Sequence, residues 1–390
     1  MHTAFDFDRR IERRNTASIK WDYYPADILP AWVADMDFAA PEPVLAALRA
    51  RIDHGVFGYG LPPAELREVI VARLARLYDW HIAPEMLTFM PGVVPGFNLA
   101  CKALAQPGEG LLIQTPVYHP ILHAAQNHGL ERQAVPLVRR SDGSYGIDFD
   151  AFEVAITKRS RLFILCNPHN PVGRVFTEKE LARMAEICLS HDLYICSDEI
   201  HGDLIFSGQR HLPIAALAPE IAARTITLMA PSKSYNIAGL ECSFAVIPDP
   251  ELRQRFRAAR AGLVPSANIL GYEAALAAYR DGDAWLEALL GYLEANRDYL
   301  QAAVDAGALP GVRMATPEGT YLAWLDCRGA GIFDQAGDFF IEHGRVALND
   351  GAMFGEEGRG FVRLNFGCPR SLLEEIIRRM QAALNARHSL

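Results

Sequence analysis

The sequence has no excess of positive charge, no run suited to a membrane and no paired cysteine motif. Its net charge of -9 at pH 7 argues against nucleic acid as the main partner, because phosphate binding requires a basic face. The charge-free run 110–130 holds two Pro, two Gln, one Asn and three His, which exclude a membrane helix. Seven cysteines form no CxxC pair, and the first residues lack the apolar core of a secretory signal. We therefore expect a soluble protein of the reducing cytoplasm.

The fingerprints of several enzyme classes are also missing. The chain has no GxGxxG after a strand, no GxxxxGK(S/T) loop, no GxSxG elbow and no HExxH. Nicotinamide, ATP and serine-hydrolase chemistry therefore lose their usual support. His119 and His123 have the spacing of two ligands on one helical face, but Pro120 lies between them and no third ligand is near. We expect no metal site.

The 390 residues, half of them apolar, suffice for two or three structural units. Up to about residue 250, short apolar runs alternate with helical patterns. This order predicts parallel strands joined by crossover helices, and hence an α/β sheet covered on both faces. The expected strands are 87–92, 110–116, 161–168, 193–199, 225–233 and 242–249. The expected helices are 42–51, 62–79, 94–104, 118–129 and 177–192.

The pattern changes near Asp283, where a long helix over 284–306 leads to two shorter strands and a terminal helix over 371–387. We expect a smaller α+β C-terminal domain here. The expected division is an N-terminal segment (1–45) that packs with the small domain, a large domain (46–284) and the small domain (285–390).

Lysine is scarce, since only five of the 38 basic residues are lysines. Lys20, Lys102, Lys158 and Lys179 lie in a loop, a helix or charged surroundings that predict no special role. Lys233 instead follows the apolar strand TITLM and lies in APSKSYNIAG. Desolvation at a strand exit lowers the pKa of a lysine and makes its amine nucleophilic. Lys233 is therefore a candidate Schiff-base lysine, although a surface loop lysine is the ordinary alternative.

Other strand exits carry residues that complement this lysine. Asp198 could pair with a protonated pyridine nitrogen, or simply cap a helix. Asn170, in CNPHNPVGR, could donate to a phenolate oxygen on the same ring, or be a plain turn residue. PGVVPG at 91–96 offers amides at a helix N-terminus for a phosphate. Tyr118 could stack on a flat ring, or belong to the core.

In this order, NPHNPVGR, SDEIH and SKSYNIAGL resemble the fold-type-I pyridoxal-phosphate enzymes of the aspartate aminotransferase superfamily. Further motifs resemble the bacterial cystathionine β-lyase and C–S lyase branch, the MalY/PatB type. These motifs are WVADMDF, FGYG, PGVVPG, TPVYHP, LNDGAMFG and FVRLNFG, between residues 32 and 367.

The resemblance implies pyridoxal 5′-phosphate as cofactor and a homodimer as the active form. Lys233 then carries the cofactor, and Tyr59 of one subunit reaches the phosphate in the other. Arg363 binds the substrate α-carboxylate bidentately. Ala230 stands where many relatives carry a phosphate-binding serine. The other implied cofactor-binding residues are Asp198 at the pyridine nitrogen, Asn170 and His201 near the ring oxygen, Tyr118 stacked on the ring, and Val93, Val94 and Ser232 at the phosphate.

The same parts support two reactions. β-Elimination from L-cystathionine or a related L-cysteine S-conjugate is favoured, because the finer motifs indicate the lyase branch. The alternative is an aminotransferase acting on an amino acid and a 2-oxo acid, and no second arginine is assignable to a distal carboxylate. A regulator built on this fold usually carries an N-terminal DNA-binding domain, for which the motifs beginning near residue 32 leave no room.

Overall fold

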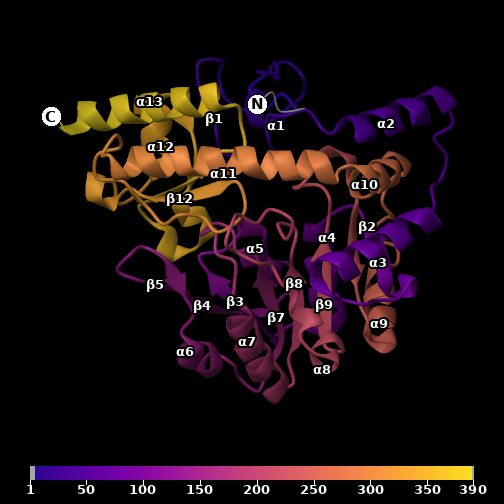
Figure 1. Ribbon diagram of the computed structural model, residues 1–390. Coiled ribbons are helices and arrows are strands. Elements are labelled where there is room, and N and C mark those ends of the chain that lie inside the picture. The colour runs from indigo at the N-terminus through magenta and orange to yellow at the C-terminus, as the bar shows by residue number, and fades with distance from the viewer. Residues whose placement is uncertain (1–4, 389–390) are drawn as a thin grey trace.

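The computed structural model describes residues 5–388, which are built around a seven-stranded sheet (Figure 1). Its strands are β2 (Leu87–Met90), β3 (Gly110–Thr115), β4 (Glu131–Pro136), β7 (Ser160–Cys166), β8 (Tyr194–Asp198), β9 (Thr225–Met229) and β10 (Ser243–Val246). They follow the order β2-β10-β9-β8-β7-β3-β4. β10 is antiparallel to both neighbours, whereas the other pairs are parallel. The predicted α/β class with a mainly parallel sheet is confirmed.

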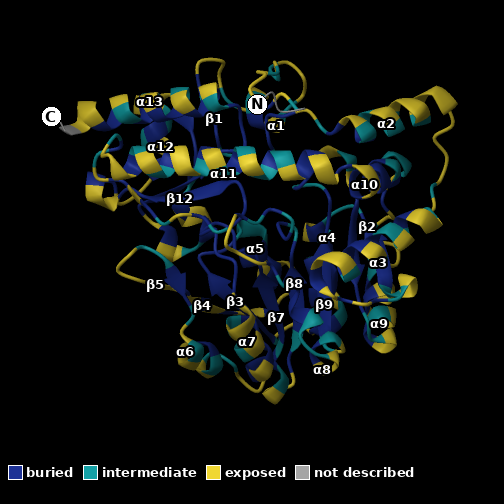
Figure 2. Cartoon of the chain, viewed as in Figure 1, coloured by how far each residue is buried: buried dark blue, intermediate teal, exposed yellow. Residues whose placement is uncertain are grey.

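Helices cover both faces of this sheet, because its strands are apolar on both sides. Leu111 and Ile113 of β3 belong to the core cluster on one face, and Leu112 between them belongs to the cluster on the other. The first cluster includes α4 (Val93–Leu104), α5 (His119–Asn127) and α9 (Pro250–Arg260). The second includes α6 (Phe149–Val154), α7 (Glu178–Ser190) and α8 (Pro219–Ala222). Among the strands between these helices, β3 is buried along its whole length and β7 in all but one residue (Figure 2).

A second sheet of four antiparallel strands lies in the C-terminal part of the chain. Its order is β11 (Arg313–Met314), β12 (Leu322–Asp326), β15 (Phe361–Asn365) and β14 (Asn349–Asp350). The long helix α11 (Asp283–Asp305), α12 (Ala336–Phe339) and the terminal helix α13 (Arg370–His388) accompany it. Figure 1 shows α11 and α13 running side by side above the larger sheet.

The N-terminal part of the chain contacts both regions. After α1 (Ile19–Asp22), strand β1 (Leu29–Pro30) pairs with β13 (Val346–Ala347) in the C-terminal part. The helices α2 (Glu42–His54) and α3 (Ala64–Tyr78) pack instead against α10 (Ile269–Asp281). A short hairpin of β5 (Val138–Arg139) and β6 (Tyr145–Gly146) forms a separate two-stranded sheet. No helix within residues 5–388 is long and apolar enough to cross a membrane.

Two features of the large sheet differ from the strand pattern expected from the sequence. β4 is an edge strand with four of its six residues exposed, so its polar sequence ERQAVP has no apolar run to mark it. β10 has the apolar run of a parallel strand but runs antiparallel, because burial on both faces gives the same pattern in either direction.

Candidate active site

A cavity of about 190 Å³ lies beside the ends of β7, β8 and β9 and the N-terminus of α4. In an open α/β sheet, this edge is where ligands bind. The structure brings together eight residues singled out in the sequence. These are Val93, Val94, Tyr118, Asn170, Asp198, His201, Ser232 and Lys233.

Lys233 lies in the turn that follows β9, and its amine Nζ donates a hydrogen bond to the Ala34 carbonyl oxygen at 2.6 Å. Burial is the largest influence on this amine, and the Arg363 charge acts in the same direction. Together they lower the pKa of Lys233 to about 8, against the opposing effect of Asp35 and Asp198. A much larger share of the amine is therefore neutral near pH 7 than in an ordinary lysine.

The turn that carries Lys233 is fixed by Asn236, which the sequence analysis did not single out. Asn236 has a φ of 55°, a left-handed conformation that asparagine tolerates better than most residues. Its side-chain amide donates to the carbonyls of Met36 and Phe38, at 2.9 and 2.8 Å. Its side-chain oxygen accepts from the Met36 amide at 2.9 Å. The N-terminal segment thus holds the lysine turn from outside the sheet.

Asp198 ends β8 and is buried, with its Oδ1 accepting a hydrogen bond from the Ile200 amide at 3.2 Å. Burial raises the pKa of Asp198 to about 7, and the neighbouring Glu199 charge adds to this effect. A carboxyl in this position gains from a cationic partner in the cavity, because such a partner favours its ionised form. A protonated pyridine nitrogen is a partner of this kind.

Arg363 on β15 is buried beside the cavity, and its hydrogen-bond partners are all neutral. It donates to Asn170 Oδ1 at 2.9 Å, the Trp32 carbonyl at 2.9 Å and Asn349 Oδ1 at 2.7 Å. The Phe354 ring lies 4.9 Å from the guanidinium carbon. Burial lowers the pKa of Arg363 to about 10. A buried cation with neutral partners is suited to bind an anion such as a carboxylate.

His201 and Tyr118 are two further cavity residues whose ionisation is suppressed. His201 is 3% exposed, and its Nδ1 has no hydrogen-bond partner among residues 5–388. Burial holds the pKa of His201 well below its ordinary value, so the ring is neutral. Tyr118 precedes α5, and its backbone amide donates to the Asn170 carbonyl at 3.0 Å. Burial raises the pKa of Tyr118, which keeps its hydroxyl protonated.

The N-terminus of α4 forms another wall of the cavity, where residues 91–95 lie. Amides in the first turn of a helix lack intrahelical partners and carry partial positive charge, which suits a phosphate. The close approach of α4 to the sheet depends on Gly96. A Cβ there would lie 2.9 Å from Leu228 Cδ2 and 3.0 Å from Met90 Sδ. Ser232 lines the same cavity, whereas Ala230 lines a different cavity behind it.

Tyr59 lies outside this cavity. It is fully exposed, in the segment between α2 and α3. Within one chain, Tyr59 is therefore not brought together with Lys233 and the other seven cofactor-binding candidates.

The sequence analysis assigned Lys20 no special role, and the structure corrects this. Lys20 is 1% exposed, because α1 packs it against the segment before Phe38. Its Nζ lies 2.7 Å from Asp37 Oδ2 and 3.6 Å from Asp35 Oδ1. Arg13 binds the same two carboxylates at 2.6 and 2.8 Å. This cluster fixes the segment whose Ala34 carbonyl accepts from Lys233.

These side chains fit pyridoxal 5′-phosphate. The cavity places a lysine amine of lowered pKa, a buried carboxyl and a helix N-terminus around one space. The amine is suited to bind the aldehyde of that cofactor, the carboxyl its ring nitrogen and the helix N-terminus its phosphate. The fold and the site together define an enzyme of the fold-type-I pyridoxal-phosphate class. The chain belongs to the aminotransferase class I and II family, whose family model matches residues 33–380.

Individual relatives indicate the branch of this family to which the chain is most similar. The chain is 40% identical over 389 residues to cystathionine beta-lyase PatB of Bacillus subtilis (strain 168), covering 97% of this chain and 100% of PatB. The crystal structure of OvoB matches with a TM-score of 0.94 and 45% identity, covering 98% of this chain and 100% of OvoB. The pyridoxal-phosphate-bound C-S lyase of Staphylococcus hominis matches with a TM-score of 0.92 and 34% identity, covering 97% and 99%. The predicted family and branch are confirmed.

Proposed function

We propose that this chain is a pyridoxal-5′-phosphate-dependent C–S β-lyase. It cleaves L-cystathionine or a related L-cysteine S-conjugate to a thiol, pyruvate and ammonia. The observation that supports this is the single cavity shared by the Lys233 amine and the Asp198 carboxyl, with the Arg363 guanidinium beside it. The similarity over nearly the whole chain to proteins named cystathionine beta-lyase and C-S lyase favours elimination over amino transfer.

Three residues carry the main steps. The bound cofactor supplies an electron sink for the charge left when the substrate loses its Cα proton. Arg363 binds the α-carboxylate and limits the substrate to one orientation. Lys233 takes the Cα proton through its neutral amine, and its lowered pKa of about 8 makes that form more available near neutral pH than in an ordinary lysine. Asp198 would pair with the ring nitrogen and favour its protonated form. The thiolate then leaves the β-carbon with the electron pair of the C–S bond, and water hydrolyses the remaining enamine to pyruvate and ammonia.

The other cavity residues hold the cofactor. Asn170 uses its side-chain oxygen on Arg363, which leaves its Nδ2 to donate to the ring oxygen. His201 and Tyr118 line the same cavity, where the neutral His201 would lie near that oxygen and Tyr118 would stack on the ring. The phosphate is bound by the amides of Val93 and Val94 and by the Ser232 hydroxyl.

The test is to give the purified protein L-cystathionine without any 2-oxo acid and to follow pyruvate and free thiol together. Release of both in equal amounts is expected. The Lys233→Ala variant is the control, since it loses the visible absorbance of the bound cofactor and all turnover. Ketone formation only after a 2-oxo acid is added would instead identify an aminotransferase.

The active form in this proposal is a homodimer. Five large apolar residues are more than half exposed on and after the end of α2, and they form what we call the exposed arm: Ile52, Val56, Phe57, Tyr59 and Leu61. An apolar surface of this kind indicates a partner surface. We place Tyr59 of each subunit at the cofactor phosphate of the other, which completes the set of cofactor contacts.

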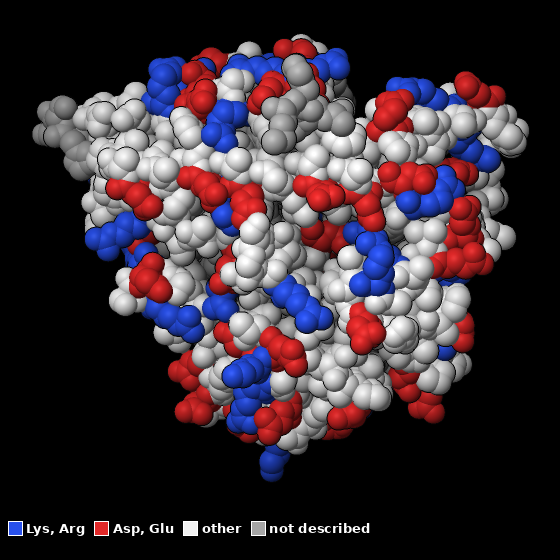
Figure 3. All heavy atoms as spheres, viewed as in Figure 1, with Lys and Arg blue, Asp and Glu red and all other residues white. Residues whose placement is uncertain are grey.

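The remaining parts of the proposal concern organisation and surroundings. The three units are the N-terminal segment 1–45, the large cofactor-binding domain 46–284 and the small domain 285–390. The substrate is a small amino acid, and the protein binds neither nucleic acid nor a membrane. Its compartment is the cytoplasm. The proposal that nucleic acid is not a partner is supported by Figure 3, in which basic and acidic side chains are interspersed on the visible face.

A further inference from the structure

A second and much smaller cavity, of about 20 Å³, lies directly behind the wall of the candidate active site. Ile200 lines both cavities. Asp198 and Lys233 line the active-site cavity. Glu199 and Met229, from the same two segments of the chain, line the rear cavity. The rear cavity thus borders the two segments that carry most of the predicted cofactor contacts.

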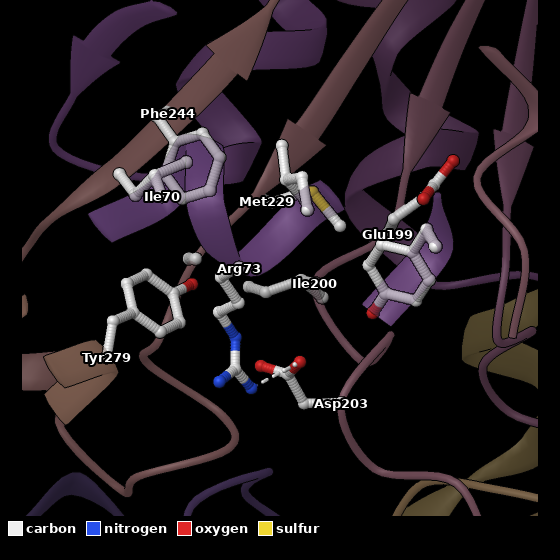
Figure 4. A pocket seen from close by; sticks show the side chains of 11 residues that line it. Ile70, Arg73, Glu199, Ile200, Asp203, Met229, Phe244 and Tyr279 are labelled. Carbon is white, nitrogen blue, oxygen red and sulfur yellow. Dashed lines mark hydrogen bonds and ion pairs between the residues drawn. The ribbon is translucent and has the colours of Figure 1, made fainter. Parts of the chain in front are cut away.

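An ion pair between Arg73 and Asp203 crosses the rear cavity (Figure 4). Arg73 comes from α3, and its Nη2 lies 2.9 Å from Asp203 Oδ1. Their side chains are only 8% and 12% exposed. The Tyr279 ring of α10 lies 5.0 Å from the Arg73 guanidinium carbon. A second nitrogen of Arg73 donates to Asp283 Oδ1 at 2.7 Å, at the start of α11. Arg73 is therefore immobilised from several directions.

The second oxygen of Asp203 reaches the lysine turn. Ser234, fully buried and next to Lys233 in the chain, donates from its Oγ to Asp203 Oδ2 at 3.0 Å. Asp203 also lies two residues after His201, in the other segment of the wall. One carboxylate therefore ties the lysine turn and the His201 segment to the same arginine. Hydrogen bonds to a charged group are stronger and more directional than neutral ones.

We propose that Asp203, held by Arg73, is a positioning residue for Lys233. The contact sets where the lysine amine lies in the cavity, through Ser234, without touching substrate or cofactor. This rests on the proposed function only in that Lys233 carries the cofactor. Catalysis is sensitive to small displacements of a reacting group, so the contact affects the rate and not substrate affinity, which depends on Arg363 on another sheet.

The sharpest test is Ser234→Ala, which removes the hydroxyl link and leaves the ion pair in place. Apoprotein is mixed with pyridoxal phosphate, and the rate at which the visible absorbance band forms is measured, followed by kcat and KM for L-cystathionine. We expect the rate of band formation and kcat each to fall about tenfold, with KM changed less than about twofold. Asp203→Asn provides a second variant. Its fold is protected because Arg73 keeps Asp283 as a partner, and we expect losses at least as large.

Arg76→Ala is the matched control. Arg76 lies on the same helix and pairs with Asp283 at 2.6 Å, but no contact joins it to Asp203. It is expected to match wild type in band formation and kcat. Wild-type band formation and kcat in Ser234→Ala, even with lowered thermal stability, would overturn the positioning role. A wild-type protein that forms the band but cleaves no C–S bond would overturn the proposed reaction alone.

Discussion

At the scale of single residues, Arg363 gives the most direct prediction. Its guanidinium binds three neutral oxygens at once, a geometry that a lysine ammonium cannot reproduce. Arg363→Lys should therefore keep a charge but lose the bidentate grip on the substrate carboxylate. We expect kcat/KM for L-cystathionine to fall about 30-fold or more, equivalent to about 2 kcal/mol. Steady-state kinetics measures this.

Arg359→Lys serves as the control for that substitution. Arg359 is exposed and pairs with Asp334 and Glu356 on the surface. Its replacement should leave kcat/KM unchanged, since exposed ion pairs contribute little. An Arg363→Lys enzyme with wild-type kcat/KM would show that the carboxylate binds elsewhere.

The lowered pKa of Lys233 predicts a pH dependence. The amine is protonated and inert below its pKa of about 8, and neutral and nucleophilic above it. The rate at which apoprotein forms the visible band should therefore rise with pH, with a midpoint near 8, and level off above. A rise that continues toward the ordinary lysine value of 10.5 would contradict the desolvated setting. Stopped-flow absorbance measures the profile, and Lys233→Ala supplies the blank.

Residue chemistry also limits what the sequence reveals about the site. Lys233 and Asp198 could be singled out because each follows an apolar strand, and the edge where such strands end is a fixed place in an α/β fold. Ala34 could not be singled out, because it contacts Lys233 through its backbone carbonyl, a group that every residue possesses. Lys20 was misjudged for a related reason. Its burial depends on how α1 folds against the segment of Asp37, a contact that local sequence does not encode.

At the scale of helices and strands, the spacing of apolar residues and the local composition predict the interior strands of a sheet well and its edge strands poorly. β3 and β7 are buried on both faces, so continuous apolar runs mark them. β4 is buried only at Gln133 and Val135, and one of these two residues is polar, so the strand resembles a loop in sequence. The second sheet was expected from two strands, over 319–327 and 360–367. Its outer strands β11 and β14 have two residues each, too few for a pattern.

Gly96 gives a prediction about the contact between α4 and the sheet. Gly96→Ala places a methyl group against Leu228 and Met90, both on buried strands that have little room to move. We expect a loss of about 1–3 kcal/mol in the free energy of unfolding, which is typical of overpacking. Cofactor affinity should weaken too, because we propose that the N-terminal amides of α4 bind the phosphate. Urea unfolding and a titration of apoprotein with pyridoxal phosphate measure the two effects.

Gly291 in α11 is the matched glycine for this experiment. It is exposed in the helix, and a Cβ there meets nothing within 4 Å. Gly291→Ala should therefore stabilise the protein by about 0.5–1 kcal/mol through helix propensity alone. Equal effects of the two substitutions would refute the packing argument for α4.

At the scale of the whole molecule, the site is assembled from three parts of the chain. Lys233 comes from the large sheet, Arg363 from the smaller one, and the Trp32 and Ala34 carbonyls that hold them come from the N-terminal segment. In the proposed function, the large sheet supplies the cofactor-binding lysine and the smaller sheet the carboxylate-binding arginine, while the N-terminal segment holds both side chains. A displacement of any one part therefore disturbs the others, and the exposed arm adds a fourth contribution from a second chain in the proposed dimer.

The dimer predicts complementation between two impaired variants. Lys233→Ala lacks the cofactor amine, and Tyr59→Ala lacks the phosphate contact that we place across the interface. A hybrid dimer then has one site with the Lys233 of one subunit and the Tyr59 of the other, both intact. After random exchange, half the dimers are hybrids with one complete site of two, so activity should return to about a quarter of wild type. If hybrids form and activity does not return, Tyr59 serves its own subunit, and the isolated chain must bring the exposed arm back across its surface to reach the cavity.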